Sequence, residues 1–152
     1  MDDLITVNRP IQEVFEFMTD QSNAKLWKPF VTESRQLTDG QIGVGTQFVE
    51  GIDIWHYHMA GIVEILEYQP PHWFVYQTRE EPYPFSLIAQ MSFEETSSGT
   101  LIRGHVEFHG HGLFWDWCTP LIRLFFKSQE KSFYHFKQVM ENIKPSIESE
   151  SK

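Results

Sequence analysis

A change in the spacing of apolar residues near Gly112 restricts the possible folds more than any other feature. From Val31 to about Gly110, turn signals such as TDGQIGVG and YQPPH separate six segments of strand length. From Leu113 to about Ile143, apolar residues recur at helical spacing, which predicts one long amphipathic helix that can bend at Pro120. Strands without intervening helices, followed by one long helix, exclude a doubly wound parallel fold.

Two of the expected strands alternate clearly enough to predict a hairpin across the turn TSSG. The first strand alternates apolar with polar positions, and its apolar members are Phe85, Leu87, Ala89, Met91 and Phe93. The second places Ile102, Gly104, Val106 and Phe108 on the inner face, and Arg103, His105, Glu107 and His109 on the outer face. The pair therefore forms part of an antiparallel sheet with one solvated side.

The N-terminal residues predict a first strand and two short helices. Leu4 to Val7 is β-branched, and the following helix has Asn8 near its N-cap and Pro10 in its first turn. A second short helix is expected from Ala24 to Lys28, because Pro29 stops it. The fold class is therefore α+β, with a seven-stranded antiparallel sheet, two short helices after the first strand and a long C-terminal helix.

Composition limits the domain count, the partners and the location. With 152 residues, 41% of them hydrophobic, the chain suits a single domain over residues 1–145, followed by a frayed polar tail at 146–152. A net charge of -9 argues against nucleic acid as a partner. No apolar run is long enough for membrane insertion, and the first residues lack a signal sequence, so we expect a cytoplasmic monomer or homodimer.

The histidine-rich stretch GHVEFHGHGLFWDWCTP raises the question of a metal site. Strand alternation directs His105 and His109 outward, and His111 lies at the end of the same strand. The only cysteine, Cys118, is expected to be a small buried apolar residue on the long helix. His56 and His58 are expected on one face of another strand, without an acidic partner nearby. We therefore predict no metal and no cofactor, and no catalytic constellation is visible.

The order of elements resembles a known family over residues 3–143. The resemblance rests on ITVNRPIQEVFEFMTDQSNAKLWKPF with Trp27, on the turn GVGTQF at Gly43–Phe48, and on GIVEILEYQPPHWFVYQT with Pro70-Pro71. These segments are similar to the polyketide cyclase/dehydratase and lipid-transport superfamily, also called START-like or SRPBCC. The resemblance implies the Bet v 1-like helix-grip fold, in which a curved sheet grips the long helix around an apolar cavity.

This resemblance implies that the protein binds a small, largely hydrophobic ligand, lipid-like or polyketide-like. Fold alone does not determine function. A cyclase or dehydratase that uses the same cavity is one alternative, and a protein-interaction module with a filled cavity is another. The residues expected to bind the ligand are Trp27, Phe48, Tyr57, Tyr76, Phe85, Leu87, Met91, Val106, Phe108, Phe126, Gln129 and Phe133.

Gln129 is the polar residue that most clearly interrupts an apolar face. It falls within the helical stripe formed by Ile122, Phe126, Gln129, Phe133, Phe136, Met140 and Ile143. A buried amide needs a hydrogen-bond partner, because leaving it unpaired costs about 1 to 3 kcal/mol. The partner is a ligand, a cavity water or a backbone group. Tyr57, Tyr76 and Thr78 supply further hydroxyls if their strand faces point inward.

Overall fold

The computed structural model describes residues 2–54, 56–79, 85–110, 112–113, 117–118, 120–121 and 130–143. Its elements follow one another in the order expected. They are β1 (Asp2–Val7), α1 (Ile11–Thr19), the 3-10 turn η1 (Gln21–Asn23), α2 (Ala24–Trp27), β2 (Val31–Gln36), β3 (Gln47–Ile54), β4 (Tyr57–Gln69), β5 (Trp73–Thr78), β6 (Phe85–Thr96), β7 (Gly99–Gly110) and α4 (Glu130–Asn142).

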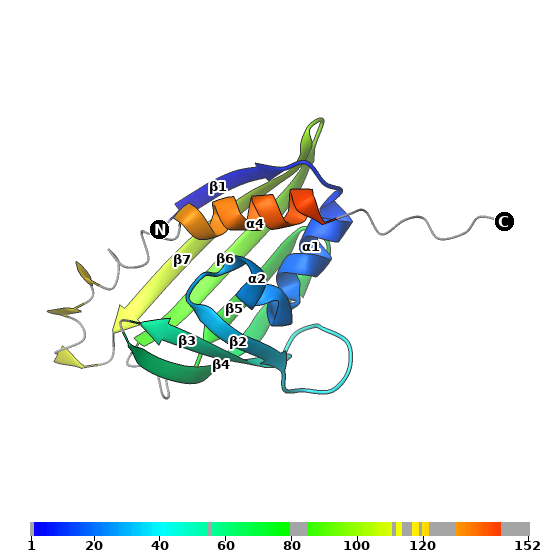
Figure 1. The fold of residues 1–152 in the computed structure, drawn as a ribbon. Helices are drawn as coiled ribbons and strands as arrows, with labels where there is room; N and C mark the ends of the chain where they lie inside the picture. Colours follow the sequence, from blue (N-terminus) through cyan, green and yellow to red (C-terminus); the bar gives the residue numbers. More distant parts are fainter. Residues whose placement is uncertain are drawn as a thin grey trace.

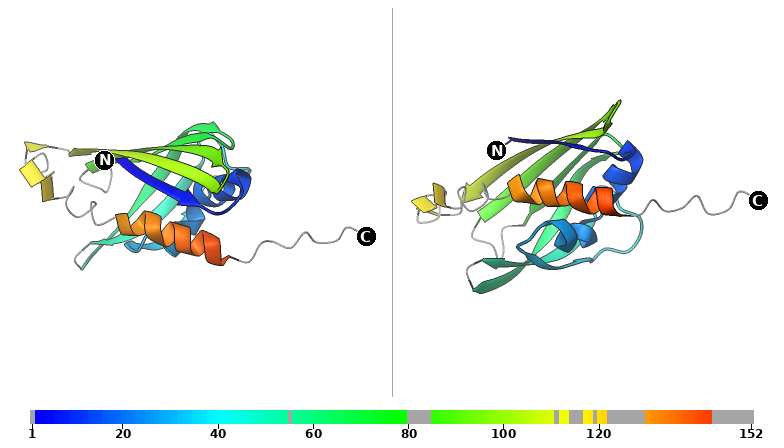
Figure 2. Two further views of the ribbon diagram at one scale, coloured as in Figure 1. Left: turned by 90° about the horizontal axis from the view of Figure 1, so that it is seen from above. Right: turned by 45° about the horizontal axis from the view of Figure 1, so that its top comes forward.

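All seven strands form one antiparallel sheet in the order β1-β7-β6-β5-β4-β3-β2. Consecutive strands pair as hairpins, except that β1 pairs with β7. The sheet curves around α4, while α1 and α2 lie at one end of its inner face (Figures 1 and 2). The predicted α+β class, the strand count and the two short helices before β2 are therefore confirmed.

The hairpin predicted across TSSG is the longest pairing in the sheet. β6 and β7 pair without interruption from Phe85 and Gly110 to Thr96 and Gly99. Gly99 has φ +124°, and a Cβ there would lie 2.1 Å from the Val7 carbonyl oxygen at the end of β1. Only glycine fits this backbone conformation so close to a neighbouring strand.

The first helix begins later than the sequence predicted. Pro10 is its N-cap and makes no side-chain cap, and the backbone N–H of Asn8 instead donates to the Glu141 carboxylate on α4. The helix buries Val14, Phe15 and Met18, as its apolar pattern predicted. The ring of Phe15 lies between 5.2 and 6.0 Å from those of Tyr68, Phe74 and Phe93. This contact fixes α1 on β4, β5 and β6.

The C-terminal helix is confirmed over Glu130–Asn142. Phe133, Phe136 and Met140 are buried as predicted, whereas Ile143 lies beyond the last turn and is exposed. Ile122, Phe126 and Gln129 fall outside the described residues, so the predicted helix from Leu113 is described only in part.

Helix α4 approaches the sheet most closely at Gly104 of β7. A Cβ there would lie 2.9 Å from the Phe133 ring and 3.1 Å from the Met91 sulfur. On its other side, α4 contacts Trp27 of α2, whose ring centroid lies 5.2 Å from that of Phe136. These contacts leave the space between the sheet and the helices unevenly filled, which sets the position of the cavity described next.

Candidate functional site

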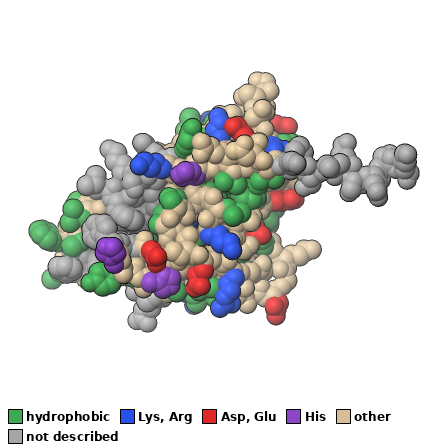
Figure 3. All heavy atoms as spheres, in the orientation of Figure 1, with side chains coloured by type: hydrophobic (Ala, Val, Ile, Leu, Met, Phe, Trp, Pro, Cys, Tyr) green, Lys and Arg blue, Asp and Glu red, His purple; other side chains and the backbone are tan. Residues whose placement is uncertain are grey.

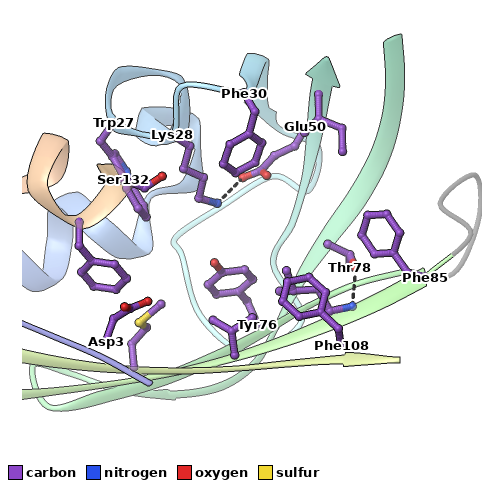
Figure 4. Close-up of a pocket in the computed structure, with 15 residues that line it drawn as sticks. Asp3, Trp27, Lys28, Phe30, Glu50, Tyr76, Thr78, Phe85, Phe108 and Ser132 are labelled. Carbon is purple, nitrogen blue, oxygen red and sulfur yellow. Dashed lines mark hydrogen bonds and ion pairs between the residues drawn. The ribbon is translucent and has the colours of Figure 1, made fainter. Parts of the chain in front are cut away.

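A cavity lies between the inner face of the sheet and the helices. Its enclosed part measures about 60 Å³, and the space between its lining residues out to solvent measures about 730 Å³. The lining residues come from seven strands and helices and from the loop after α2 (Figure 4). They are Asp3, Trp27, Lys28, Phe30, Glu50, Ile52, Tyr76, Thr78, Phe85, Leu87, Met91, Val106, Phe108, Ser132 and Phe133.

One wall of this largely apolar cavity carries a buried ion pair. The Lys28 ammonium lies 3.2 Å from the Glu50 carboxylate, and both side chains are only 7% exposed. The same ammonium donates to the Gln21 side-chain carbonyl at 3.0 Å, and the Gln21 amide donates to the backbone carbonyl of Met18. Figure 4 shows the pair facing Tyr76 across the cavity. We call Gln21, Lys28, Glu50 and Tyr76 the polar cluster.

Local structure places each charge inside. Lys28 is the C-cap of α2, where its N–H donates to the Ala24 carbonyl, and Pro29 then turns the chain toward β2. Glu50 alternates with Phe48 and Ile52 on the inner face of β3. The sequence prediction found no carboxylate inside the cavity, and this is wrong for Glu50. Its position between two inward apolar residues of one strand is the signal that could have revealed it.

Tyr76 completes the cluster from β5. Its ring centroid lies 5.1 Å from the Lys28 ammonium, which also interacts with the phenol oxygen. Burial raises the pKa of Tyr76, and although Lys28 opposes this effect, the phenol stays protonated. Burial alone would lower the pKa of Lys28, but Glu50 and Tyr76 outweigh it and hold the pKa above its usual value. The cluster therefore holds an ammonium and a neutral phenol.

Ser132 contributes a different kind of polar group from α4. Its side chain is buried at 2% exposure, and among the residues that the structure describes its hydroxyl has no hydrogen-bond partner. It lines the same cavity as Lys28 and Tyr76 (Figure 4). A buried hydroxyl without a partner is costly, so a group that enters the cavity can gain by pairing with it.

The structure brings eight of the twelve predicted binding residues together around this cavity. These eight are Trp27, Tyr76, Phe85, Leu87, Met91, Val106, Phe108 and Phe133. Phe48 is fully buried on β3 but does not line the cavity. Tyr57 was placed wrongly, since it begins β4 at the hairpin end and is 76% exposed. Phe126 and Gln129 lie outside the described residues.

The histidines that the sequence raised as metal candidates lie away from the cavity. His105 and His109 point outward, as strand alternation predicted, and His105 binds Asp2 and Glu107. His58 was wrongly expected to lack an acidic partner, because Asp53 lies 2.7 Å from its Nδ1. His56 sits in the β3–β4 turn at φ 100° and not in the strand. Within the described residues, no three His, Cys, Asp or Glu side chains are placed to share a metal ion.

Two further expectations concern the segment around Cys118. Cys118 is half-buried and not fully buried as predicted, and His111 lies outside the described residues. Trp117 is exposed, as its position opposite the apolar stripe suggested.

A second depression, on the outer face of the sheet, differs in character from this cavity. It measures about 430 Å³, is open to solvent, and is lined mainly by residues of β1, β6 and β7, among them Leu4, Gln90, Arg103 and His105. Leu4 and Arg103 are exposed there. Because the polar cluster and the unpaired Ser132 hydroxyl face the inner cavity, that cavity is the candidate site.

Solved structures match this fold over nearly the whole chain. Ara h 8.0201 superposes with a TM-score of 0.65 at 17% identity, covering 93% of this chain and 97% of the other. Protein NE0264 from Nitrosomonas europaea gives 0.69 at 14% identity, with 93% of each chain covered. The di-domain ARO/CYC BexL from the BE-7585A biosynthetic pathway gives 0.73 at 12% identity, covering 93% of this chain and 49% of that one.

Sequence comparison places the chain in a family. No curated protein matches the sequence significantly. The family model described as polyketide cyclase / dehydrase and lipid transport matches residues 2–141, which is nearly the entire described chain. The solved structures share the helix-grip arrangement of a curved antiparallel sheet around a C-terminal helix. The protein therefore belongs to the polyketide cyclase/dehydrase and lipid-transport family and has the helix-grip fold that its sequence resembled.

Proposed function

We propose that the protein binds a small, largely hydrophobic molecule, lipid-like or polyketide-like, between the sheet and the C-terminal helix. The observation that carries this proposal is the polar cluster set in the wall of an otherwise apolar cavity. Ligand sites are typically apolar pockets with a few convergent polar groups that orient the ligand. The family description, which includes lipid transport, supports the same assignment.

The two volumes suggest how such a ligand fits. The enclosed part, about 60 Å³, is well below the roughly 300 to 1,000 Å³ of common ligand sites. It accommodates the polar end of a ligand beside Lys28 and Tyr76. The apolar remainder extends through the wider space between Phe85, Leu87 and Phe108 toward solvent.

A neutral fluorophore and a pair of neighbouring substitutions test this proposal. Leu87→Trp fills the cavity, whereas Ile88→Trp places the same ring on the outer face of β6, because successive strand residues point to opposite faces. Nile red should bind the parent and Ile88→Trp with similar affinity and bind Leu87→Trp at least about tenfold more weakly. Equal binding by both variants, or none by the parent, would refute the cavity as a binding site.

A cyclase or dehydratase activity is the second candidate. The convergence of a protonated phenol and an ammonium favours it, because these groups stabilise negative charge that develops on a carbonyl oxygen. One structural neighbour is described as an ARO/CYC protein of a biosynthetic pathway. Incubation with a linear poly-β-ketone thioester, followed by mass spectrometry, tests for cyclisation with loss of one water. Turnover that survives Tyr76→Phe unchanged would remove Tyr76 from this role.

The expectations on partners and location also stay proposals. Lys, Arg, Asp and Glu side chains are interspersed on the face that carries α4 (Figure 3), and nucleic acid favours clustered basic residues instead. Among the described residues, no helix is long and apolar enough to cross a membrane. We therefore keep a cytoplasmic monomer or homodimer as the working assignment, which size-exclusion chromatography with light scattering can check for the oligomer.

A further inference from the structure

We propose that the cavity selects a neutral ligand with a carbonyl oxygen, which accepts hydrogen bonds from the hydroxyls of Tyr76 and Ser132. This inference rests on the proposed function, since it names the class of ligand for the same cavity. Its starting point is Ser132, whose hydroxyl is buried in the cavity wall without a partner among the residues described. Tyr76 lies on the opposite wall, on the sheet (Figure 4).

Both hydroxyls are suited to donate to a ligand oxygen. The Lys28 ammonium has only donors, so in its contact with the Tyr76 phenol the phenol oxygen accepts, and the phenol proton is available to another acceptor. Burial raises the pKa of Tyr76, which keeps that proton in place. Ser132 can direct its proton to the same acceptor, because hydroxyl protons rotate. A carbonyl oxygen, with two lone pairs, accepts both bonds.

Charge in the cavity wall favours a neutral ligand over a carboxylate. The positive charge of Lys28 is already matched by Glu50 at 3.2 Å, and two of its hydrogen atoms point to Gln21 and Glu50. The carboxyl group of Asp3 lines the same cavity. An anionic ligand would therefore be buried next to two carboxyl groups and a single compensated cation, and burying an unmatched charge is costly. A ketone, ester or amide carries no such penalty.

Three probes of similar size test the assignment: acetophenone, ethylbenzene and benzoate. They present a neutral carbonyl, no polar group and a carboxylate. Binding is followed by the Met91 methyl resonance, because Met91 lines the cavity. The parent should bind acetophenone about 3- to 10-fold more tightly than ethylbenzene, as one or two net hydrogen bonds allow, and benzoate most weakly. Ser132→Ala and Tyr76→Phe should each remove most of this preference and leave the ethylbenzene affinity unchanged.

Two matched variants control for general effects on the fold. Ser92→Ala removes a hydroxyl from the outer face of β6, and Tyr134→Phe removes one from the exposed side of α4. Both should keep the preference for acetophenone. Ser132→Ala should also keep the melting temperature of the parent, because it removes a buried hydroxyl without a described partner.

Each contrary outcome has a distinct meaning. Equal affinities for acetophenone and ethylbenzene in the parent would overturn the two-hydroxyl assignment and leave the proposed function standing. Tightest binding of benzoate would overturn the selection of neutral ligands and assign Lys28 to an anion. If no probe shifts the Met91 resonance, the cavity does not bind small apolar molecules and both proposals fail.

Discussion

Lys28 and Glu50 form an ion pair in which each buried charge depends on the other. Lys28→Met removes the ammonium and leaves the Glu50 carboxylate in the apolar wall without that counter-charge. Breaking a buried pair in this way typically costs about 3 to 5 kcal/mol of the free energy of unfolding. Chemical denaturation of the parent and the variant measures the loss.

Two further variants separate this effect from the loss of any surface charge. Arg103→Met breaks the exposed pair Arg103–Glu94, which has a 3.5 Å separation, and should cost at most about 1 kcal/mol. The double variant Lys28→Met/Glu50→Leu removes both buried charges and should recover most of the lost stability. A loss for Lys28→Met no larger than that for Arg103→Met would contradict the burial of the pair.

His105 links the first strand to the last through its ring. Its hydrogen bonds to Asp2 and then Glu107 raise its pKa above the ordinary value of 6.5. The stabilisation from a raised pKa is fully present below pH 6.5 and disappears as the pH rises through the folded-state value. An NMR titration should give a midpoint above 6.5 that falls in Asp2→Asn. A midpoint at or below 6.5 in the parent would contradict the contact.

Sequence reasoning reached one member of the ion pair only in principle. Glu50 lies between Phe48 and Ile52, and strand alternation places all three on one face once Phe48 is assigned inward. Lys28 follows a helix of four residues, which is too short to show a period, and its direction depends on the turn at Pro29. Tyr57 was misplaced because a residue at the end of a hairpin escapes the burial of its strand neighbours.

At the scale of elements, α4 joins the two halves of the molecule through Phe136. This ring is fully buried and packs against Phe17 of α1 and Trp27 of α2, with centroids 5.9 and 5.2 Å away. Phe136→Ala should lower the free energy of unfolding by about 3 to 5 kcal/mol, since it opens a cavity among aromatic rings. Thermal denaturation followed by circular dichroism measures the change.

The control for this substitution lies on the same helix. Tyr134 is exposed, so Tyr134→Ala should alter the free energy of unfolding by less than about 1 kcal/mol. Similar melting temperatures for Phe136→Ala and the parent would mean that α4 does not pack on α1 and α2 as described.

The elements that sequence predicted best are those with long, regular patterns. The β6–β7 hairpin has two alternating strands of 12 residues each, and their burial follows the prediction. The N-terminus of α1 was less accurate, because Asn8 is an ordinary N-cap residue but here donates its backbone N–H to Glu141, far along the chain. A contact between distant segments leaves no local pattern in the sequence.

At the scale of the whole molecule, the change of apolar spacing near Gly112 predicted a sheet followed by a helix, and the described structure has both. The cavity could not be predicted in the same way. Its wall takes one or a few residues from each of seven strands and helices, and its size is the small difference between large packed volumes. The curvature of the sheet and the bulk of facing rings determine that difference.

Native mass spectrometry of the freshly purified protein, supplied with a mixture of lipids and polyketide-like ketones, tests the central claim most directly. The account predicts that the parent carries one small molecule that Leu87→Trp fails to retain and Ile88→Trp keeps. A parent that shows only the mass of the polypeptide, or a Leu87→Trp variant that retains the same molecule, would contradict ligand binding in the cavity.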